Sequence, residues 1–384
     1  MTEQILKDLQ FFYPEVALTV TLLLAIITDL MFRRSWKPVA TVVALGLIVT
    51  GALVLRQGEM HASIFGNMIA VDSFAFFFKL VIILSAILIV VFSLGSNELN
   101  TQGRRLGEYY FLLVALTLGM VLMAGASNLL MMYLALELSS ITSYILVGYT
   151  REAQDSSEAS LKYVIYGALS SGLMLYGISI IYGITGSLDI YTINRVLGNS
   201  NVNQLVLLIA GVLTIAGFGY KISAVPFHFW TPDVYEGAPI TITAFLSVAS
   251  KAGGFAMMIR FFKVTFIDTT IASQHLGGWM SIKGFDWVAV VAAISVLTMT
   301  LGNLVAVWQN NMKRLLAYSS IAHAGYMLMG LVVLNNEGLS AILIYFVIYL
   351  FMNLGAFYIV MLIANKTGSE DIEDYKGIGP KAPF

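Results

Sequence analysis

Four ionisable side chains lie inside long apolar stretches of the chain, and their chemistry is suited to proton transfer. They are Glu137, Lys162, Lys221 and Lys251, and they fall on four consecutive apolar stretches. A charged side chain in hydrocarbon is costly and usually marks an ion pathway or a buried ion pair. Burial penalises the charged form of a lysine, whereas a nearby carboxylate favours it. An acid that approaches or leaves one of these bases would therefore change its affinity for a proton.

Residues 217–239, GFGYKISAVPFHFWTPDVYEGAP, combine such a lysine with signals for a broken helix. This stretch holds Lys221, His228 and three of the chain's 7 prolines. Pro226 lacks a backbone N–H, which interrupts helical hydrogen bonding a little over one turn after Lys221. Many transporters build ion sites from broken helices at mid-membrane depth. We therefore predict a helix break between Lys221 and Pro226.

Composition places these residues in a polytopic membrane protein. Hydrophobic residues make up 58% of the 384, charged residues 11%, and the mean hydropathy is +0.84. The apolar runs, roughly 18–28 residues long, suit helices that cross a bilayer rather than the shorter strands of a barrel. We predict an all-α protein with eleven transmembrane helices. The predicted spans lie near 11–31, 38–55, 72–95, 108–126, 128–148, 159–184, 203–226, 239–263, 286–308, 314–334 and 339–364.

Several kinds of site are excluded or disfavoured by the sequence. The chain has no cysteine, which rules out thiolate-held iron–sulfur clusters, cysteine zinc sites and disulfides within it. It has neither a phosphate-binding loop nor an H-E-x-x-H motif. No basic stripe suggests nucleic acid. Only His228 and His323 could ligate haem within the spans, and neither has an obvious partner, so we expect no metal or cofactor in this chain.

An internal repeat predicts two inverted structural units. The sequence Thr-Leu-Gly begins at Thr117 and again at Thr300, and Asn128 and Asn311 follow eleven positions later in each copy. The copies start on the fourth and ninth spans. Because this offset of five spans is an odd number, the two copies must face opposite ways across the membrane. The similar endings are 144–148 and 326–330. The predicted divisions are 1–107 (helices 1–3), 108–263 (a first repeat with a proton half-channel) and 264–384 (an incomplete second repeat).

Structural roles are alternatives for each candidate. Glu137 could be permanently paired with Lys162 or Lys221, and Lys162 is near enough to a membrane face to snorkel. His228 could be a packing residue. His323, which the repeat places one turn past the counterpart of Glu137, could have a polar role in the second unit. Residues near span ends are interpreted as interfacial anchors: Asp29, Asp72, Lys79, Arg260, Trp230, Trp279, Trp287 and Trp308.

Three segments resemble a known family. They are ALELSSITSYILVGY, EASLKYVIYGALSSGLMLYGISIIYGITGS and GFGYKISAVPFHFWTPDVYEGAPITITAFLSVASKAGG. These segments are similar to the antiporter-like membrane subunits of respiratory complex I, the proton-pumping NADH:quinone oxidoreductase, and most of all to the N type. The resemblance covers essentially the whole chain. Members usually have fourteen helices, so the resemblance implies a chain truncated at its C-terminus.

The resemblance implies a role for each candidate. Glu137 would be the fifth-helix glutamate, Lys162 the sixth-helix lysine, Lys221 the lysine of the broken seventh helix, and Lys251 the eighth-helix lysine. His228 matches the histidine after the break. NADH, FMN, iron–sulfur clusters and quinone would belong to partner subunits. The implied partners are other membrane-arm subunits, the lipid bilayer and protons, in a bacterial inner (plasma) membrane.

Three other functions remain open from the sequence. The chain could be an Mrp-type cation/proton antiporter subunit that works without redox partners. It could be a membrane subunit of an energy-converting hydrogenase. It could also be a structural spacer whose buried charges are static pairs.

Overall fold

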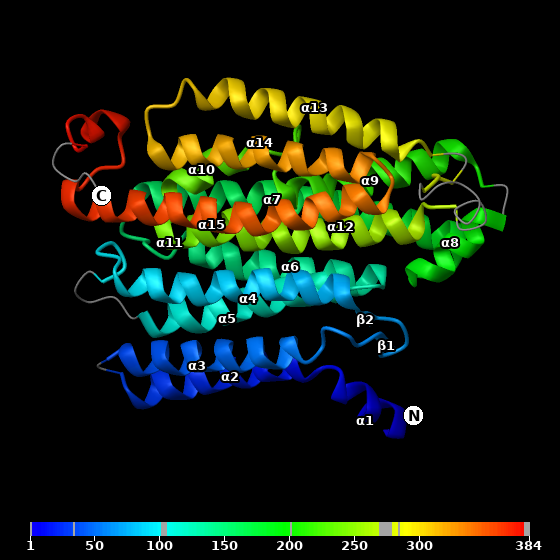
Figure 1. Cartoon of the computed structure of the whole chain (residues 1–384), viewed down its shortest axis with the longest axis horizontal. Coiled ribbons are helices and arrows are strands. Elements are labelled where there is room, and N and C mark those ends of the chain that lie inside the picture. Colours follow the sequence, from blue (N-terminus) through cyan, green and yellow to red (C-terminus); the bar gives the residue numbers. More distant parts are fainter. Residues whose placement is uncertain are drawn as a thin grey trace.

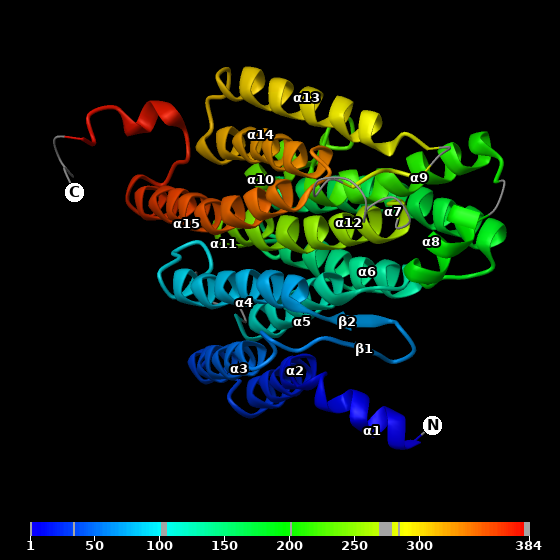
Figure 2. The same cartoon turned by 45° about the vertical axis from the view of Figure 1, so that its right-hand side comes forward.

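A computed structural model of the chain describes residues 2–33, 35–100, 106–199, 202–268, 279–282 and 285–379. Within these ranges the protein is almost entirely helical, and the main helices run side by side along one axis (Figure 1). Helices α2 and α3 lie at one edge of the bundle and α13 at the other, both in this view and in the turned one (Figure 2).

In the described residues, eleven helices are long and apolar enough to cross a membrane, and each overlaps one of the predicted spans. The prediction of an all-α polytopic protein is thus confirmed. The spans are α2 (Tyr13–Met31), α3 (Lys37–Leu55), α4 (Ser73–Leu94), α5 (Leu106–Gly125), α6 (Leu129–Val147), α7 (Gln154–Thr185), α9 (Gln204–Ile222), the continuous helix Ile240–Thr265, α13 (Trp287–Ala306), α14 (Met312–Val332) and α15 (Asn336–Thr367).

Short elements at the ends of the spans were not predicted. Hairpin β1–β2 and the amphipathic helix α8 lie at the end of the bundle opposite the C-terminal segment (Figure 1). The short elements are α1 (Thr2–Gln10), β1 (Ala62–Ile64), β2 (Ile69–Val71), α8 (Ile190–Asn199), α10 (Trp230–Gly237) and the 3-10 turn η2 (Ile372–Tyr375).

Local sequence sets where the spans begin and end. Proline stands in the first turn of α2 and α3, where its missing N–H costs nothing. Six spans begin after an asparagine or aspartate whose side chain accepts a hydrogen bond from a first-turn amide. The two longest helices, α7 and α15, end at Gly186 and Gly368, whose φ angles of 67° and 73° favour glycine.

The seventh span is broken where the sequence predicts it. Helix α9 ends at Ile222, and Ser223 follows in the left-handed region with φ 62°. The chain resumes as α10 after Pro226. The eighth span is continuous but changes winding: α11 (Ile240–Phe245) passes through a π-helical turn, η1 (Leu246–Ser250), into α12 (Lys251–Thr265). Lys221 and Lys251 therefore both adjoin an irregularity in helical hydrogen bonding.

The two predicted repeats share a local architecture. In the first, the N-cap Asn128 of α6 pairs with Asp189 just beyond α7; in the second, the N-cap Asn311 of α14 pairs with Asp371 just beyond α15. Leu129 N donates to Leu188 O at 2.8 Å, and Met312 N donates to Glu370 O at 2.9 Å. The two pairings lie at opposite ends of the bundle (Figure 1). Units α5–α7 and α13–α15 thus share this pairing at opposite ends of the bundle, as expected for inverted copies.

Three of the predicted interfacial anchors, Asp72, Lys79 and Arg260, lie in ion pairs, and the pair formed by Lys79 is buried on both sides. Lys79 of α4 is 1% exposed and lies 2.6 Å from Glu15 of α2, which is equally buried. Lys79 Nζ also donates to Gln57 Oε1 at 3.3 Å. Arg260 of α12 is buried against Asp72. Trp230 and Trp287 are buried as well, because they fill aromatic clusters between helices.

The Glu15–Lys79 pair generates a prediction about stability. Glu15→Leu alone leaves Lys79 buried without its counter-charge, and losing one partner of such a pair costs about 3–5 kcal/mol. The double variant Glu15→Leu/Lys79→Met removes both charges and should recover most of that loss. Thermal unfolding of the detergent-purified protein would measure both. Breaking the exposed Lys376–Glu373 pair is the control and should have little effect. Equal stability of Glu15→Leu and this control would contradict the prediction.

Candidate functional site

Lys221 lies buried in the last turn of α9, directly before the helix break. Its side chain is 1% exposed, and Nζ donates to Ser140 Oγ of α6 at 3.5 Å. Glu137 is one turn before Ser140 on the same face of α6. Its charge acts on Lys221, yet no ion pair within 4.0 Å joins the two among the described residues. Buried Oε1 of Glu137 has no hydrogen-bond partner there. Ser140 thus contacts the base, while the acid one helical turn away lies beyond ion-pair distance of it.

Lys251 is buried at the start of α12 and reaches across to the second unit. Its Nζ donates to Ser320 O of α14 at 2.5 Å and to Ser320 Oγ. No carboxylate forms an ion pair with it in the described part of the chain. His323, one turn after Ser320, is electrostatically coupled to Lys251, and its Nδ1 hydrogen-bonds Tyr345 Oη at 2.5 Å.

The π-helical turn before Lys251 supplies additional polar contacts. Ser247 O accepts a hydrogen bond from Tyr349 Oη at 3.2 Å, and Ser247 Oγ accepts one from Asn353 Nδ2 at 2.7 Å. Asn353 also donates to Tyr349 Oη at 3.2 Å. A π turn leaves backbone carbonyls out of the regular ladder. Helix α15 therefore bonds to the backbone and side chain just before Lys251.

The backbones around Lys221 and Lys251 approach closely at a glycine. A Cβ added to Gly254 of α12 would lie 3.1 Å from Lys221 Cγ and 2.9 Å from Ile222 Cγ2. Gly254 is three residues after Lys251, on the same face of α12. The structure thus places the buried Lys221 and Lys251 in one region, with the partly buried Glu137 close to Lys221.

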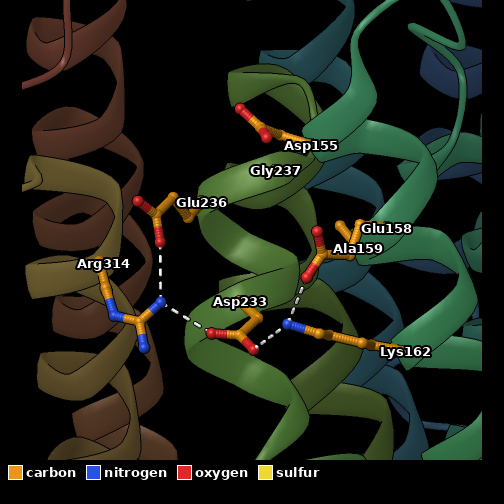
Figure 3. A pocket seen from close by; sticks show the side chains of 8 residues that line it. All are labelled: Asp155, Glu158, Ala159, Lys162, Asp233, Glu236, Gly237 and Arg314. Atoms are coloured by element: carbon orange, nitrogen blue, oxygen red, sulfur yellow. Dashed lines mark hydrogen bonds and ion pairs between the residues drawn. The ribbon is translucent and has the colours of Figure 1, made fainter.

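Lys162 lies apart from that region, in an ion-pair cluster at the surface (Figure 3). Its side chain is 38% exposed and lies 2.7 Å from both Glu158 and Asp233. Arg314 of α14 bonds Asp233 at 2.7 Å and Glu236 at 2.8 Å. The cluster lines a pocket of about 260 Å³. It joins α7, α10 and α14.

Several buried polar atoms around the break have no hydrogen-bond partner among the described protein atoms. His228 is 4% exposed, its ring lies tilted by 31° against that of Phe229 with 4.5 Å between the centroids, and its Nδ1 has no hydrogen-bond partner. Buried hydroxyls in this condition are normally satisfied by internal water. The unpartnered hydroxyls near the break and the π turn belong to Ser223, Thr231, Tyr235 and Ser250.

Asp72 and Arg260 form a second charged link, near the end of the bundle that carries the hairpin. Arg260 bonds both carboxylate oxygens of Asp72, at 2.7 and 2.9 Å. Burial raises the pKa of Asp72, but the hydrogen bond and charge of Arg260 and the Ala75 amide outweigh it and lower the pKa overall. A lowered pKa means that this link stabilises the fold above the usual carboxyl pKa, and the contribution is lost as pH falls through the lowered value.

Sequence reasoning missed some of these contacts. Ser320, Asn353 and Asp233 were not singled out from the sequence as site residues. The repeated motif T-G-S-x-D-I, at 185–190 and 367–372, was a signal that could have located the pairings of Asp189 and Asp371. Over the described ranges, no group of three or more His, Asp or Glu could hold a metal ion.

The family follows from a match over residues 126–384 to the transmembrane model described as NADH:quinone oxidoreductase/Mrp antiporter. The chain belongs to this family. It is 52% identical over 376 residues to "NADH-quinone oxidoreductase subunit N 2" of Chloroherpeton thalassium, covering 97% of this chain and 72% of that protein. It is 46% identical, with the same coverage, to "NADH-quinone oxidoreductase subunit N" of Chlorobium chlorochromatii.

Solved structures support the same family. A chain of respiratory complex I from Thermus thermophilus matches with a TM-score of 0.74 and 30% identity, over 96% of this chain and 75% of that one. A chain of the Mrp complex from a Dietzia species matches with a TM-score of 0.79 over 94% of this chain and 66% of that one, but its 20% identity shows the fold alone. The predicted resemblance to the N-type subunits is confirmed, as is a multi-pass protein of a bacterial plasma membrane.

The contact at Gly254 generates a prediction with a control beside it. Gly254→Ala places a methyl group against Lys221 and Ile222, and such overpacking typically costs about 1–3 kcal/mol. At Gly253 a new Cβ would meet Met120 at an ordinary 3.4 Å, so Gly253→Ala should be neutral or up to about 1 kcal/mol stabilising through helix propensity. Thermal unfolding of the two purified variants provides the comparison. A Gly254→Ala protein as stable as Gly253→Ala would show that the close packing on Lys221 is absent.

Proposed function

We propose that the chain is a proton-translocating membrane-arm subunit of a NADH:quinone oxidoreductase of the complex I type, and thus part of a redox-driven translocase. Its family and its identity to N-type subunits support the class of complex. The observation that carries the mechanism is buried Lys221 at a helix break, within electrostatic reach of Glu137 but without contact. Such a pair can exist in a near and a far state without unfolding its helices.

A change in this pair has the right size to move a proton. Two unit charges 4 Å apart attract by about 4 kcal/mol at an effective dielectric constant of 20. Moving one charge across 100 mV requires about 2.3 kcal/mol. Closing or opening the Glu137–Lys221 pair therefore changes the proton's free energy by an amount comparable to the work of translocation. Because the two groups interact, they titrate as a coupled set.

The route that we propose runs from Lys221 to Lys251 and into the second unit. Unpartnered hydroxyls of Ser223 and Ser250 lie near the two lysines in sequence and can bind water that passes protons. Lys251 then contacts Ser320, with Tyr349 and the His323–Tyr345 pair nearby. His228, buried at the break with Nδ1 free of protein partners, is a second candidate for this route.

Lys162 has a different place in the proposal. Its exposed ion pairs with Glu158 and Asp233 put it in the surface pocket rather than in the buried region around Lys221 and Lys251. We assign it to the water-facing end of the first half-channel, within residues 108–263. Residues 264–384 would contribute the second unit, and 1–107 the helices beside the first.

Redox chemistry would occur in partner subunits. NADH, FMN, iron–sulfur clusters and quinone are expected there, since this chain has no cysteine to hold a cluster. The similarity to a chain of complex I supports contacts with other membrane-arm subunits. Lipid would cover the outward faces of the spans.

Substitutions in the assembled complex test the proposal. Lys221→Ala or Glu137→Ala removes one member of the pair, so NADH-driven proton translocation and coupled quinone reduction should fall about tenfold or more, as when a positioned proton-transfer group is lost. Both rates are measured in membrane vesicles and normalised to complex content. Exposed Lys376→Ala is the control and should behave as wild type.

The double variant Glu137→Leu/Lys221→Met separates a relay from a static pair. A relay stays inactive when both charges are removed, whereas a static pair can be replaced by apolar residues with little loss. Normal proton translocation by the double variant would refute the relay.

A further inference from the structure

We propose that Thr298 of α13 is a positioning residue: it holds the break in the seventh span, and with it Lys221, from the second structural unit. This inference rests on the proposed function, because it concerns how Lys221 is kept in place for proton transfer. Thr298 is fully buried and belongs to a helix of the other repeat.

The hydrogen bonds of the break single out one amide. Ala224 N donates to Gly219 O at 2.8 Å, and Phe227 N donates to Ala224 O at 2.7 Å, so these amides are satisfied within the segment. Val225 N instead donates to Thr298 Oγ1 at 3.0 Å. An amide left unpaired in a buried setting is costly. The irregular backbone four residues after Lys221 therefore depends on a side chain from outside the segment.

The Thr298 hydroxyl is oriented for this contact. It donates its own proton to Ile294 O, one turn earlier in α13, at 2.5 Å. Its oxygen lone pairs thus remain available to accept from Val225. Valine has the same shape but no acceptor, whereas serine keeps the hydroxyl.

Thr298 lies on the same face of α13 that packs against α14. Ser295 Oγ donates to Gly325 O at 2.7 Å on one side of Thr298. On the other side, Gly302 packs directly against the backbone of Ala322. A shift of the α13–α14 pair would thus move the acceptor of Val225 N. The contact is a mechanical link from the second unit to the lysine of the first.

The test compares Thr298→Val with Thr298→Ser in the assembled complex. One readout is amide hydrogen exchange of the segment around 223–227, which reports on the break whether or not Lys221 carries protons. The other is NADH-driven proton translocation, normalised to complex content. Thr117→Val is the matched control, because Thr117 is also buried and also donates to the carbonyl four residues earlier, at 2.7 Å.

We expect Thr298→Val to speed exchange in this segment about tenfold, the effect of losing one buried hydrogen bond, and to lower proton translocation. Thr298→Ser should restore both, and Thr117→Val should change neither. Wild-type exchange in Thr298→Val would overturn the proposal. Faster exchange with normal translocation would also overturn it, and Lys221→Ala would then show separately whether the proposed function itself fails.

If Thr298→Val does not assemble, Thr298→Ala still tests the proposal. Thr298→Ala leaves room for water to satisfy Val225 N–H, so it should assemble where the valine does not. It should still exchange faster than wild type at the break. Wild-type exchange and translocation in an assembled Thr298→Ala complex would overturn the proposal.

Discussion

The charge of Lys221 has to be accommodated inside an apolar bundle, and the broken seventh span is arranged around that need. The lysine lies in the last turn of α9, where the helix C-terminus presents carbonyl groups with partial negative charge. Ending the helix there offsets part of the cost of burying an ammonium group. Ser140 supplies one acceptor, and Glu137 supplies a full charge that remains out of contact. The break is therefore part of how the charge is stabilised.

A break in a membrane helix also has to be held, because its backbone loses regular partners. Three contacts do so from different elements. Trp230 Nε1 donates to Tyr220 O at 3.1 Å, which joins α10 back to α9. Thr298 accepts from Val225 N. Asp233 links α10 to both α7 and α14 through its ion pairs. The second half of the broken span is thus fastened to both repeats, while the first half carries the lysine.

The spans and the break could be predicted because they follow from local sequence: long apolar runs, capping residues, and a proline soon after a buried lysine. Pair contacts could not be predicted, because they depend on packing between distant segments. Glu15 and Lys79 are 64 positions apart (79 − 15), and nothing local marks them as partners. The position of Lys162 depends on the length of its side chain, which lets the ammonium group reach surface carboxylates from an apolar span. Repeat pairing was predictable only in part, because the similar ending begins 27 positions after Thr117 (144 − 117) but 26 positions after Thr300 (326 − 300), a slip of one residue between the copies.

The slip does not prevent a comparison of the two units at their glycine contacts. Gly119 packs against the backbone of Ser139, as Gly302 packs against that of Ala322. Counting back two residues from each, the counterpart of Glu137 is Ser320, the residue that Lys251 contacts. Lys221 therefore has a carboxylate within reach, whereas Lys251 meets a neutral hydroxyl and a carbonyl. Under the proposed function, a positive charge moves from Lys221 to Lys251 favourably only when Glu137 withdraws, so this difference gives the direction of transfer a structural basis.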